Sequence, residues 1–303
     1  MLGPLLFTAY ISPIGRVVGR LGVKHHEYAD DTQLYVEMTD RGSLDRLSRC
    51  IHCLQHWFLR NHLLLNGSKS DAIIIGTAQR HARAPQPAHL RVAESCVAVS
   101  DSLKLLGVTL DRTMSFDKHV STVVRACNFH LSALRHIRSL IPDTVAQQIA
   151  CSIVGSRLDY CNSLLVNCSN RNLDKLQRVQ DNLARVVCNS NRSASAGPLL
   201  RSLHWLPVRQ RINFKLAKLC YLVTSLQQPG YLADLISPYS QSRSLRSSTQ
   251  KFLSVPPHNL DTAARRFSVA APRLWNSLPL TCRTAPSVNT FKIRLKTFLF
   301  ASA

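Results

Sequence analysis

The chain has 303 residues, of which 45% are hydrophobic and 18% are charged, a composition that argues against collagen-like, coiled-coil and disordered proteins. Its length suits one large domain or two ordinary ones. Lysine and arginine exceed aspartate and glutamate by 21, and the surplus is uneven: residues 1–110 carry a net charge of +3 and residues 111–303 carry +18. Such a surplus favours a polyanionic partner, nucleic acid above all, although basic residues also serve solubility.

The cysteines fit a protein of a reducing compartment. No export signal opens the chain and no run of about 18 apolar residues follows, so we expect an intracellular protein with no membrane partner and with its ten cysteines as free thiols. The tightest group of metal-ligating residue types is Cys50, His52, Cys53 and His56. Core packing is preferred over a zinc site for this group, because no second pair follows at a suitable spacing and the residues fall in a helical pattern.

The first elements are a helix and a hairpin. A helix is predicted from near Pro4 to Gly22, because apolar residues recur there at helical spacing. The segment KHHEYADDTQLYVEM (24–38) then places apolar and aromatic residues on both sides of a short polar centre. This pattern predicts a β-hairpin with Asp30 and Asp31 at its tip.

A second group of elements completes the first third of the chain. An amphipathic helix is predicted with Asp40 or Ser43 as its cap, since both residue types favour helix N-termini. The elements expected here are, in order, that helix over 43–64, a turn at Asn66-Gly67, a short buried strand over Ala72–Ile75, a loop over 79–90, and two strands around a turn at Ser100–Ser102.

From Asp111 onward the apolar spacing is helical. The stretch 228–286 is rich in proline and serine and has few long periodic runs, so Trp205 and Trp275 are expected to anchor loops to the helices. The expected elements are helices over 116–134, 145–153, 173–183 and 208–226, a polar linker over 189–198, and a final amphipathic helix over 287–300.

The paired acids at the hairpin tip are the sharpest chemical feature. Two adjacent carboxylates on a rigid turn repel each other unless a cation lies beside them. Mg²⁺ binds through one or two carboxylates, and two such ions about 4 Å apart can activate a hydroxyl and stabilise a leaving pyrophosphate. Taken alone, Asp30 and Asp31 are also compatible with an ordinary solvated surface pair.

Several motifs together resemble one enzyme family. The segments LGPLLFTAYISPIG (2–15) and HHEYADDTQLYVEM (25–38) closely resemble the palm of non-LTR (LINE-type) retrotransposon reverse transcriptases. LNGSKSDAIIIG (65–76) and LKLLGVTLDRTMSFDKHV (103–120) resemble the motifs that follow, and the remaining helices resemble the C-terminal extension of jockey-like elements. The resemblance implies an α+β fold: a partial palm of antiparallel strands and helices over 1–110, a mainly helical thumb over 111–188, and a basic C-terminal extension over 199–303.

The resemblance also implies roles for particular residues. Lys69 would lie near the incoming triphosphate, although a solvated turn lysine is the alternative reading, and Asp71 stands where the family has Glu. The other implied roles are catalytic metal binding by Asp30 and its neighbour Asp31, a floor beside the primer end from Tyr28 and Ala29, a primer grip from Leu106, Gly107 and Val108, and the end of the nucleotide-side helix motif at Gly3 and Pro4.

One acid that the family requires is missing. Between Met1 and Ala29 the only acidic residue is Glu27, which lies on the same predicted strand as the tip and cannot act from a neighbouring strand. We therefore expect a truncated RNA-directed DNA polymerase, inactive in nucleotidyl transfer on its own, with weak or absent Mg²⁺ binding. RNA and DNA template-primer are the expected partners, with the missing N-terminal part if it is encoded elsewhere. The alternatives are a non-enzymatic nucleic-acid-binding protein and a retrotransposon remnant without a selected role.

Overall fold

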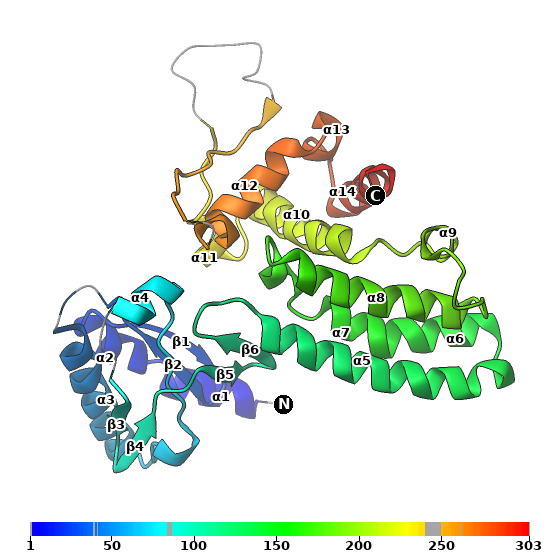
Figure 1. The fold of residues 1–303 in the computed structure, drawn as a ribbon. Coiled ribbons are helices and arrows are strands. Elements are labelled where there is room, and N and C mark those ends of the chain that lie inside the picture. The colour runs from blue at the N-terminus through cyan, green and yellow to red at the C-terminus, as the bar shows by residue number, and fades with distance from the viewer. Residues whose placement is uncertain are drawn as a thin grey trace. The chain divides into compact units, whose positions relative to one another are not determined.

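The structure is a computed structural model that describes residues 2–38, 40, 42–83, 87–239, 250–260 and 262–302. Its fold class is α+β: helices predominate, and the strands of the described residues pair into three antiparallel two-stranded sheets. The chain divides into two compact units, unit 1 (1–103 and 111–113) and unit 2 (104–110 and 114–303), coloured from blue to cyan and from green to red in Figure 1.

Unit 1 combines short strands with helices around a small core. The chain passes from unit 1 to unit 2 within the hairpin of β5 (Ser102–Leu105) and β6 (Val108–Asp111). The elements before it are α1 (Gly3–Ile11), α2 (Ile14–Arg20), β1 (Lys24–Tyr28), β2 (Asp31–Tyr35), α3 (Gly42–Arg60), the 3-10 turn η1 (Gly67–Lys69), α4 (Ala78–Arg83), β3 (His89–Val92) and β4 (Ser95–Ala98).

The predicted first helix is interrupted at Pro13. Proline has no N–H to donate to the carbonyl of Ala9, and its ring crowds that carbonyl, so α1 ends at Ile11 and α2 begins at Ile14. The Ser12 hydroxyl donates to the same Ala9 carbonyl at 2.9 Å and satisfies it. The prediction of one continuous helix was therefore wrong, although its end at Gly22, with a φ of +67°, is confirmed.

The predicted β-hairpin is confirmed. Strands β1 and β2 pair in antiparallel register from Lys24 opposite Tyr35 to Tyr28 opposite Asp31, which leaves Ala29 and Asp30 as a two-residue turn. Ala29 has a φ of +53°, the sign that a type II′ turn requires at its first central residue. The hairpin lies over a core made by α2, α3 and neighbouring side chains: Ile11, Ile14, Val18, Val23, Cys50 and Leu54, with Leu34 of β2 packed against them.

Helix α3 confirms the amphipathic helix predicted over 43–64 but ends earlier, at Arg60. The Ser43 hydroxyl donates to Asp40 Oδ1 at 3.0 Å, and this hydrogen bond is the main cause that lowers the pKa of Asp40. Core packing was the expectation for the cysteines of this helix. It is confirmed for Cys50, which is fully buried, and wrong for Cys53 and for the histidines of the same group, His52 and His56, which are all exposed.

Two other predictions in unit 1 were wrong. Ala72–Ile75 is not a strand, because Ala72 alone forms a bridge, with Val99. The backbone N–H of Ser100 donates to the Ala72 carbonyl at 2.8 Å, and among the described residues no further strand pairing follows. The loop predicted over 79–90 contains most of α4 at its start and the beginning of β3 at its end. The alanine, glutamine and arginine residues of α4 are good helix formers, whereas the prediction gave more weight to the prolines that follow them.

Unit 2 is built from helices around two adjoining cores (Figure 1). One core lies between α5, α6–α7 and α8, and the other between α10, α12 and α14. Helix α10 contributes Val208 and Ile212 to the first and Leu216 and Cys220 to the second. The elements are α5 (Asp117–Ile137), η2 (Arg138–Leu140), α6 (Asp143–Ile149), the π-helical η3 (Ala150–Gly155), α7 (Ser156–Asp159), η4 (Asn162–Leu165), α8 (Asn170–Val187), α9 (Ala196–Ser202), α10 (Val208–Leu226), α11 (Gly230–Ala233), η6 (Ala263–Arg265), α12 (Phe267–Ser277), α13 (Leu280–Arg283) and α14 (Val288–Ala301).

The five helical runs predicted after Asp111 are confirmed by α5, α6 with η3, α8, α10 and α14. Helix α12 was missed, because Pro272 inside it and the surrounding prolines and serines argued for irregular structure. Trp275 is buried within α12, and its Nε1–H donates to the carbonyl of Lys251 at 2.9 Å, so it does anchor an adjoining loop, but from a helix. Trp205 is buried in the first core.

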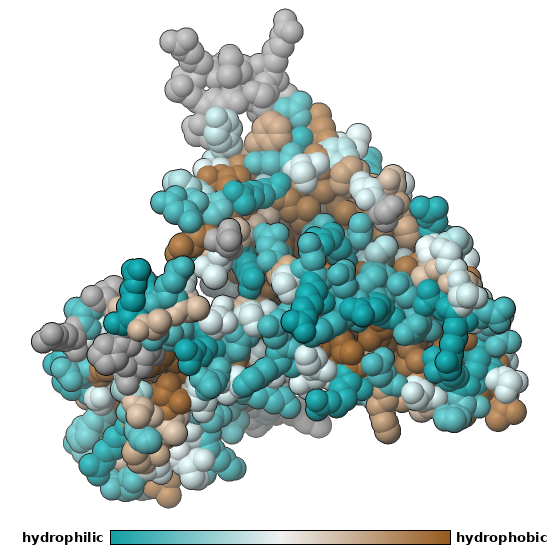
Figure 2. Space-filling view, in the orientation of Figure 1, coloured by the Kyte–Doolittle hydropathy of each residue, from teal (hydrophilic) through white to brown (hydrophobic). Residues whose placement is uncertain are grey.

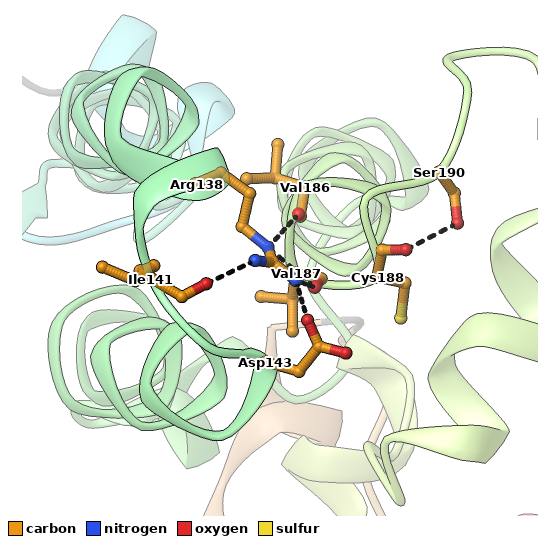
Figure 3. Close-up of polar contacts among 7 residues, drawn as sticks. All are labelled: Arg138, Ile141, Asp143, Val186, Val187, Cys188 and Ser190. Carbon is orange, nitrogen blue, oxygen red and sulfur yellow. Dashed lines mark hydrogen bonds and ion pairs between the residues drawn. The ribbon is translucent and has the colours of Figure 1, made fainter.

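A buried arginine ties three helices of unit 2 together. Arg138 follows α5, and its guanidinium donates from Nε to the carbonyls of Val186 and Val187 at 3.1 and 3.0 Å, and from Nη1 to Ile141 O at 3.0 Å (Figure 3). It also forms an ion pair with Asp143 at the start of α6. The last carbonyls of a helix have no partner within it, and a cation is favourable there. Arg138 therefore closes α8 and fixes the α5–α6 connection.

Candidate metal and nucleic-acid sites

The tip of the β1–β2 hairpin is exposed. Asp30 lies in the two-residue turn and Asp31 begins β2 directly opposite Tyr28, whose side chain is 60% exposed. Ala29 and Asp30 form the turn between the paired residues Tyr28 and Asp31. The structure thus brings these four residues together at one solvent-facing end of unit 1. Two carboxylates in adjacent positions create a local negative charge at this end.

Glu27 does not extend the acidic tip. Side chains alternate along a strand, so Glu27 lies on the face opposite to Tyr28 and Asp31. Its side chain is only 20% exposed, and its Oε1 lies 3.5 Å from Nε2 of His25 on the same face. Within the described part of the chain, no group of three or more His, Cys, Asp or Glu side chains is arranged to hold a metal ion. The tip therefore offers two carboxylates, a donor set that fits one weakly held Mg²⁺ and does not fit a pair of ions.

Lys69 lies on a separate, well-anchored turn. Asn66 Oδ1 accepts hydrogen bonds from the backbone N–H groups of Ser68 at 3.1 Å and Lys69 at 3.3 Å. Gly67 is buried against the β3–β4 hairpin, where an added Cβ would lie 2.6 Å from the carbonyl oxygen of Val92. The Lys69 side chain is exposed, and among the described residues no hydrogen bond or ion pair joins it to the hairpin tip. The structure thus fixes the turn, and the described residues show no direct contact of Lys69 with the carboxylates of the tip.

The predicted primer-grip residues form the tight turn between β5 and β6. Leu106 and Gly107 have φ angles of +45° and +83°, the combination that a type I′ turn requires, and Val108 is buried. Tyr160 supports this turn: its hydroxyl donates to the Leu106 carbonyl at 2.6 Å, and a Cβ on Gly107 would lie 3.3 Å from its ring. Sequence reasoning gave Tyr160 no role, because nothing near it in the sequence links it to residue 106.

Gly3 and Pro4 begin α1, on the exposed side of unit 1. A Cβ added to Gly3 would meet no atom within 4 Å. The neighbouring Leu2, Leu5 and Leu6 have exposed fractions of 70%, 69% and 64%, so α1 presents an apolar face to solvent. Large apolar faces of this kind mark surfaces that contact another molecule or segment.

Unit 2 carries most of the positive charge. Strongly hydrophilic side chains cover most of the visible face over α5 and α8 in Figure 2. Arg171, Lys175 and Arg178 follow one another on α8 at steps of four and three, which places them along one side of the helix. Such a stripe is suited to successive phosphates of a nucleic-acid backbone.

A second basic group joins α10 to α14. Burial, the nearby Lys292 and the nearby Lys215 together lower the pKa of Lys218, in that order of importance. Helix α14 packs against α10 at this level, with the rings of Tyr221 and Phe291 stacked at 4.4 Å. No ion pair of the described residues neutralises these three lysines. An anion is the natural partner for cations held together in this way.

Comparison with known proteins gives no further assignment: no family model, no curated protein and no solved structure matches this chain. Of the helices that the structure describes, none has both the length and the apolar character to cross a bilayer. What the structure shows is two adjacent exposed carboxylates at the hairpin tip of unit 1 and basic side chains on the helices of unit 2.

Proposed function

We propose that this chain is a palm and thumb segment of a non-LTR retrotransposon reverse transcriptase that cannot catalyse nucleotidyl transfer by itself. The observation that carries the proposal is the exposed pair Asp30 and Asp31 at the tip of a tight antiparallel hairpin. The motif resemblance and the basic helical unit that follows support it further.

The predicted inactivity rests on the donor count at the tip. A two-metal reaction needs carboxylates on both sides of the ions, so that the attacking and the leaving oxygens are each stabilised. Asp30 and Asp31 are adjacent on one hairpin, and Glu27 lies on its opposite face. We accordingly derive no catalytic step for the chain alone.

Primer extension tests this proposal. The purified chain is given a primed RNA template, deoxynucleotides and Mg²⁺, and we expect no extension. Magnesium-dependent extension that disappears in Asp30→Ala, and persists in the control Asp40→Ala, would show that the chain is a complete polymerase. Asp40 is a suitable control because it is an exposed acid of the same unit, outside the tip.

The second candidate function is nucleic-acid binding without catalysis, favoured by the net charge of +18 after residue 110. Each phosphate contact to a single strand adds about 0.7 to the slope of log affinity against log salt, because counterions are released. We expect a steep slope for a labelled single-stranded RNA. A flat salt response would remove this candidate, whether or not the chain extends primers.

The exposed apolar surface of unit 1 leads to an expected solution behaviour. Helix α1 exposes Leu2, Leu5 and Leu6, and among the described residues the β1–β2 hairpin has no third strand on either edge. Exposed edges and apolar faces promote association. We expect poor solubility of the isolated chain; a sharp monomeric peak in size-exclusion chromatography, with cooperative unfolding, would count against the palm assignment.

A further inference from the structure

Unit 2 contains a polar pocket on the surface of its helices. It lies between the C-terminal half of α8, the segment that leads into α9, and the start of α10, and its volume is about 600 Å³. The polar side chains that line it include those of Gln177, Asp181, Arg185, Ser193, Ser195 and Arg209.

Hydrogen bonds hold the walls of this pocket in place. Arg185 Nε donates to the carbonyl of Ala194 at 2.8 Å, which ties the segment after α8 back onto that helix. Gln177 Oε1 accepts from the backbone N–H of Val208 at 2.8 Å, which ties α8 to the first turn of α10. The pocket is therefore formed before any ligand arrives, and binding needs little rearrangement.

The two arginines keep donors for a ligand. Arg185 also donates from Nη1 to Asn182 Oδ1 at 3.1 Å, and Arg209 donates from Nη2 to Asn170 Oδ1 at 2.8 Å. Within the part of the chain that the structure describes, the remaining guanidinium nitrogen of Arg185, Nη2, and the Nε and Nη1 of Arg209 have no protein partner, and no carboxylate forms an ion pair with either residue.

One acid lies in the pocket and sets its charge. Asp181 Oδ1 accepts from Gln177 Nε2 at 2.7 Å and does not pair with Arg185 or Arg209. Two guanidinium groups against one carboxylate leave a positive pocket, with the hydroxyls of Ser193 and Ser195 as further donors. Planar guanidinium groups and hydroxyls together match the several oxygens of a phosphate group.

We propose that this pocket binds a phosphate group of a single-stranded nucleic acid, with Arg185 and Arg209 as the two cationic contacts. The inference rests on the nucleic-acid-binding candidate above and is independent of the carboxylates at the hairpin tip. A free phosphorylated small molecule is the other source of the same chemistry, so both sources are tested.

The test compares two double variants of the full chain that lose the same charge. Arg185→Gln/Arg209→Gln removes the pocket cations, and Arg135→Gln/Arg273→Gln removes two exposed arginines of α5 and α12 outside it. We expect the pocket variant to bind a labelled single-stranded RNA at least about tenfold more weakly than the control variant, a loss of at least about 1.4 kcal/mol, because it lacks both cationic contacts to the phosphate group. Its salt slope is expected to fall by about 0.7, the value for one phosphate contact to a single strand.

A third variant changes affinity in the opposite direction. Asp181→Asn keeps an oxygen that can accept from Gln177 and removes the negative charge, so it should bind the RNA more tightly than the wild-type chain. This gain cannot arise from a folding defect. If Arg185→Gln/Arg209→Gln unfolds the segment around Ala194, the RNA affinity of Asp181→Asn still decides: a gain supports the pocket as the binding site, and no gain contradicts it.

Each outcome is decisive. If the pocket variant loses pyrophosphate binding by calorimetry but keeps RNA binding, the pocket takes a free phosphorylated molecule, and the nucleic-acid source is overturned. If the wild-type chain binds RNA with a steep salt slope and the pocket and control variants weaken equally, this inference fails while the nucleic-acid-binding candidate stands. If the wild-type chain binds neither probe, both fail.

Discussion

The two units of this chain differ most in what their carboxylates do. In unit 1 the acids Asp30 and Asp31 project into solvent at a hairpin tip and other acids form mostly exposed ion pairs, whereas in unit 2 Asp143 and Asp159 pair with largely buried arginines. The structural pairs of unit 2 are Asp143 with Arg138, Asp159 with Arg211, Asp117 with Asn172, and Asp181 with Gln177.

The two units also differ in net charge. Residues 1–110 are close to electrical neutrality and carry the metal-ligand candidates, whereas residues 111–303 carry a surplus of +18. Asp143 and Asp159 pair with Arg138 and Arg211, and the lysines and arginines after residue 110 greatly outnumber the acids, so most of these cations have no carboxylate to neutralise them. The overall charge of the chain is therefore a property of one unit and not of the molecule as a whole.

The largest predicted effect is on unit 2 alone. Arg138→Met removes a buried guanidinium, leaves the Val187 carbonyl without its donor and takes one donor from the Val186 carbonyl, so the free energy of unfolding should fall by about 3 kcal/mol. Hydrogen exchange should accelerate in α5 and α8 and stay unchanged in α3. Arg135→Met, an exposed change in the last turn of α5, is the control and should shift stability by less than about 0.5 kcal/mol. Equal losses in the two variants would contradict the role given to Arg138.

The matching change in unit 1 is smaller. In Gly67→Ala the new Cβ would lie 2.6 Å from the Val92 carbonyl oxygen and 2.7 Å from Cβ of Ser95, so the backbone must shift at a cost of about 2 kcal/mol. Gly3→Ala is the control, because its Cβ would meet open space. The expected result is faster hydrogen exchange in β3 and β4 for the first variant only. Unchanged exchange there would show that the Asn66-Gly67 turn does not pack on this hairpin.

A third prediction concerns pH and the second core of unit 2. Burial raises the pKa of the Cys220 thiol from 9.0 to about 12. A raised pKa means that the folded state favours the neutral thiol. The contribution of the buried thiol to the free energy of unfolding is therefore complete below pH 9.0 and is lost as the pH rises toward 12. Over the first pH unit above 9.0 the loss is about 1 kcal/mol. In urea unfolding, Cys220→Ala should lack this part of the alkaline decline. Identical pH profiles for the variant and the wild-type chain would refute it.

The smallest effect is expected at the hairpin tip. Asp30→Asn/Asp31→Asn removes two exposed, mutually repelling charges, so stability should change by less than about 0.5 kcal/mol. Any Mg²⁺ binding that a calorimetric titration detects for the wild-type chain should be lost in this variant. A large loss of stability would mean that the carboxylates serve the fold, and unchanged Mg²⁺ binding would place the metal elsewhere.

Local patterns predicted the hairpin and the long helices, because each depends on residues close in sequence. The apolar residues around Asp30 and Asp31 and the periodic spacing along α5 and α8 are of this kind. Two errors concerned proline. Pro13 divides a segment that was predicted to be one helix, whereas Pro272 lies inside α12, where no helix was predicted. The strand predicted at Ala72–Ile75 failed because a strand also needs a partner, which the sequence does not reveal.

The sites divide in the same way. The acidic tip is contiguous, so it was visible in the sequence, but the opposite orientation of Glu27 emerges only from the register of β1 and β2. The support of Leu106 by Tyr160 joins residues far apart along the chain. The pocket of Arg185 and Arg209 likewise depends on how α8 and α10 pack. None of these three arrangements could be predicted from the sequence, because each depends on residues that only the folded chain brings together.

We propose above all that unit 2 binds nucleic acid and that the acidic tip of unit 1 takes no part in this binding. Hydrogen exchange of the full chain, with and without a single-stranded RNA at low salt, tests it most directly. The account predicts slower exchange in peptides from α8 to α10, and no change over Lys24–Tyr35. Slower exchange at that hairpin, with none in α8 to α10, would contradict it.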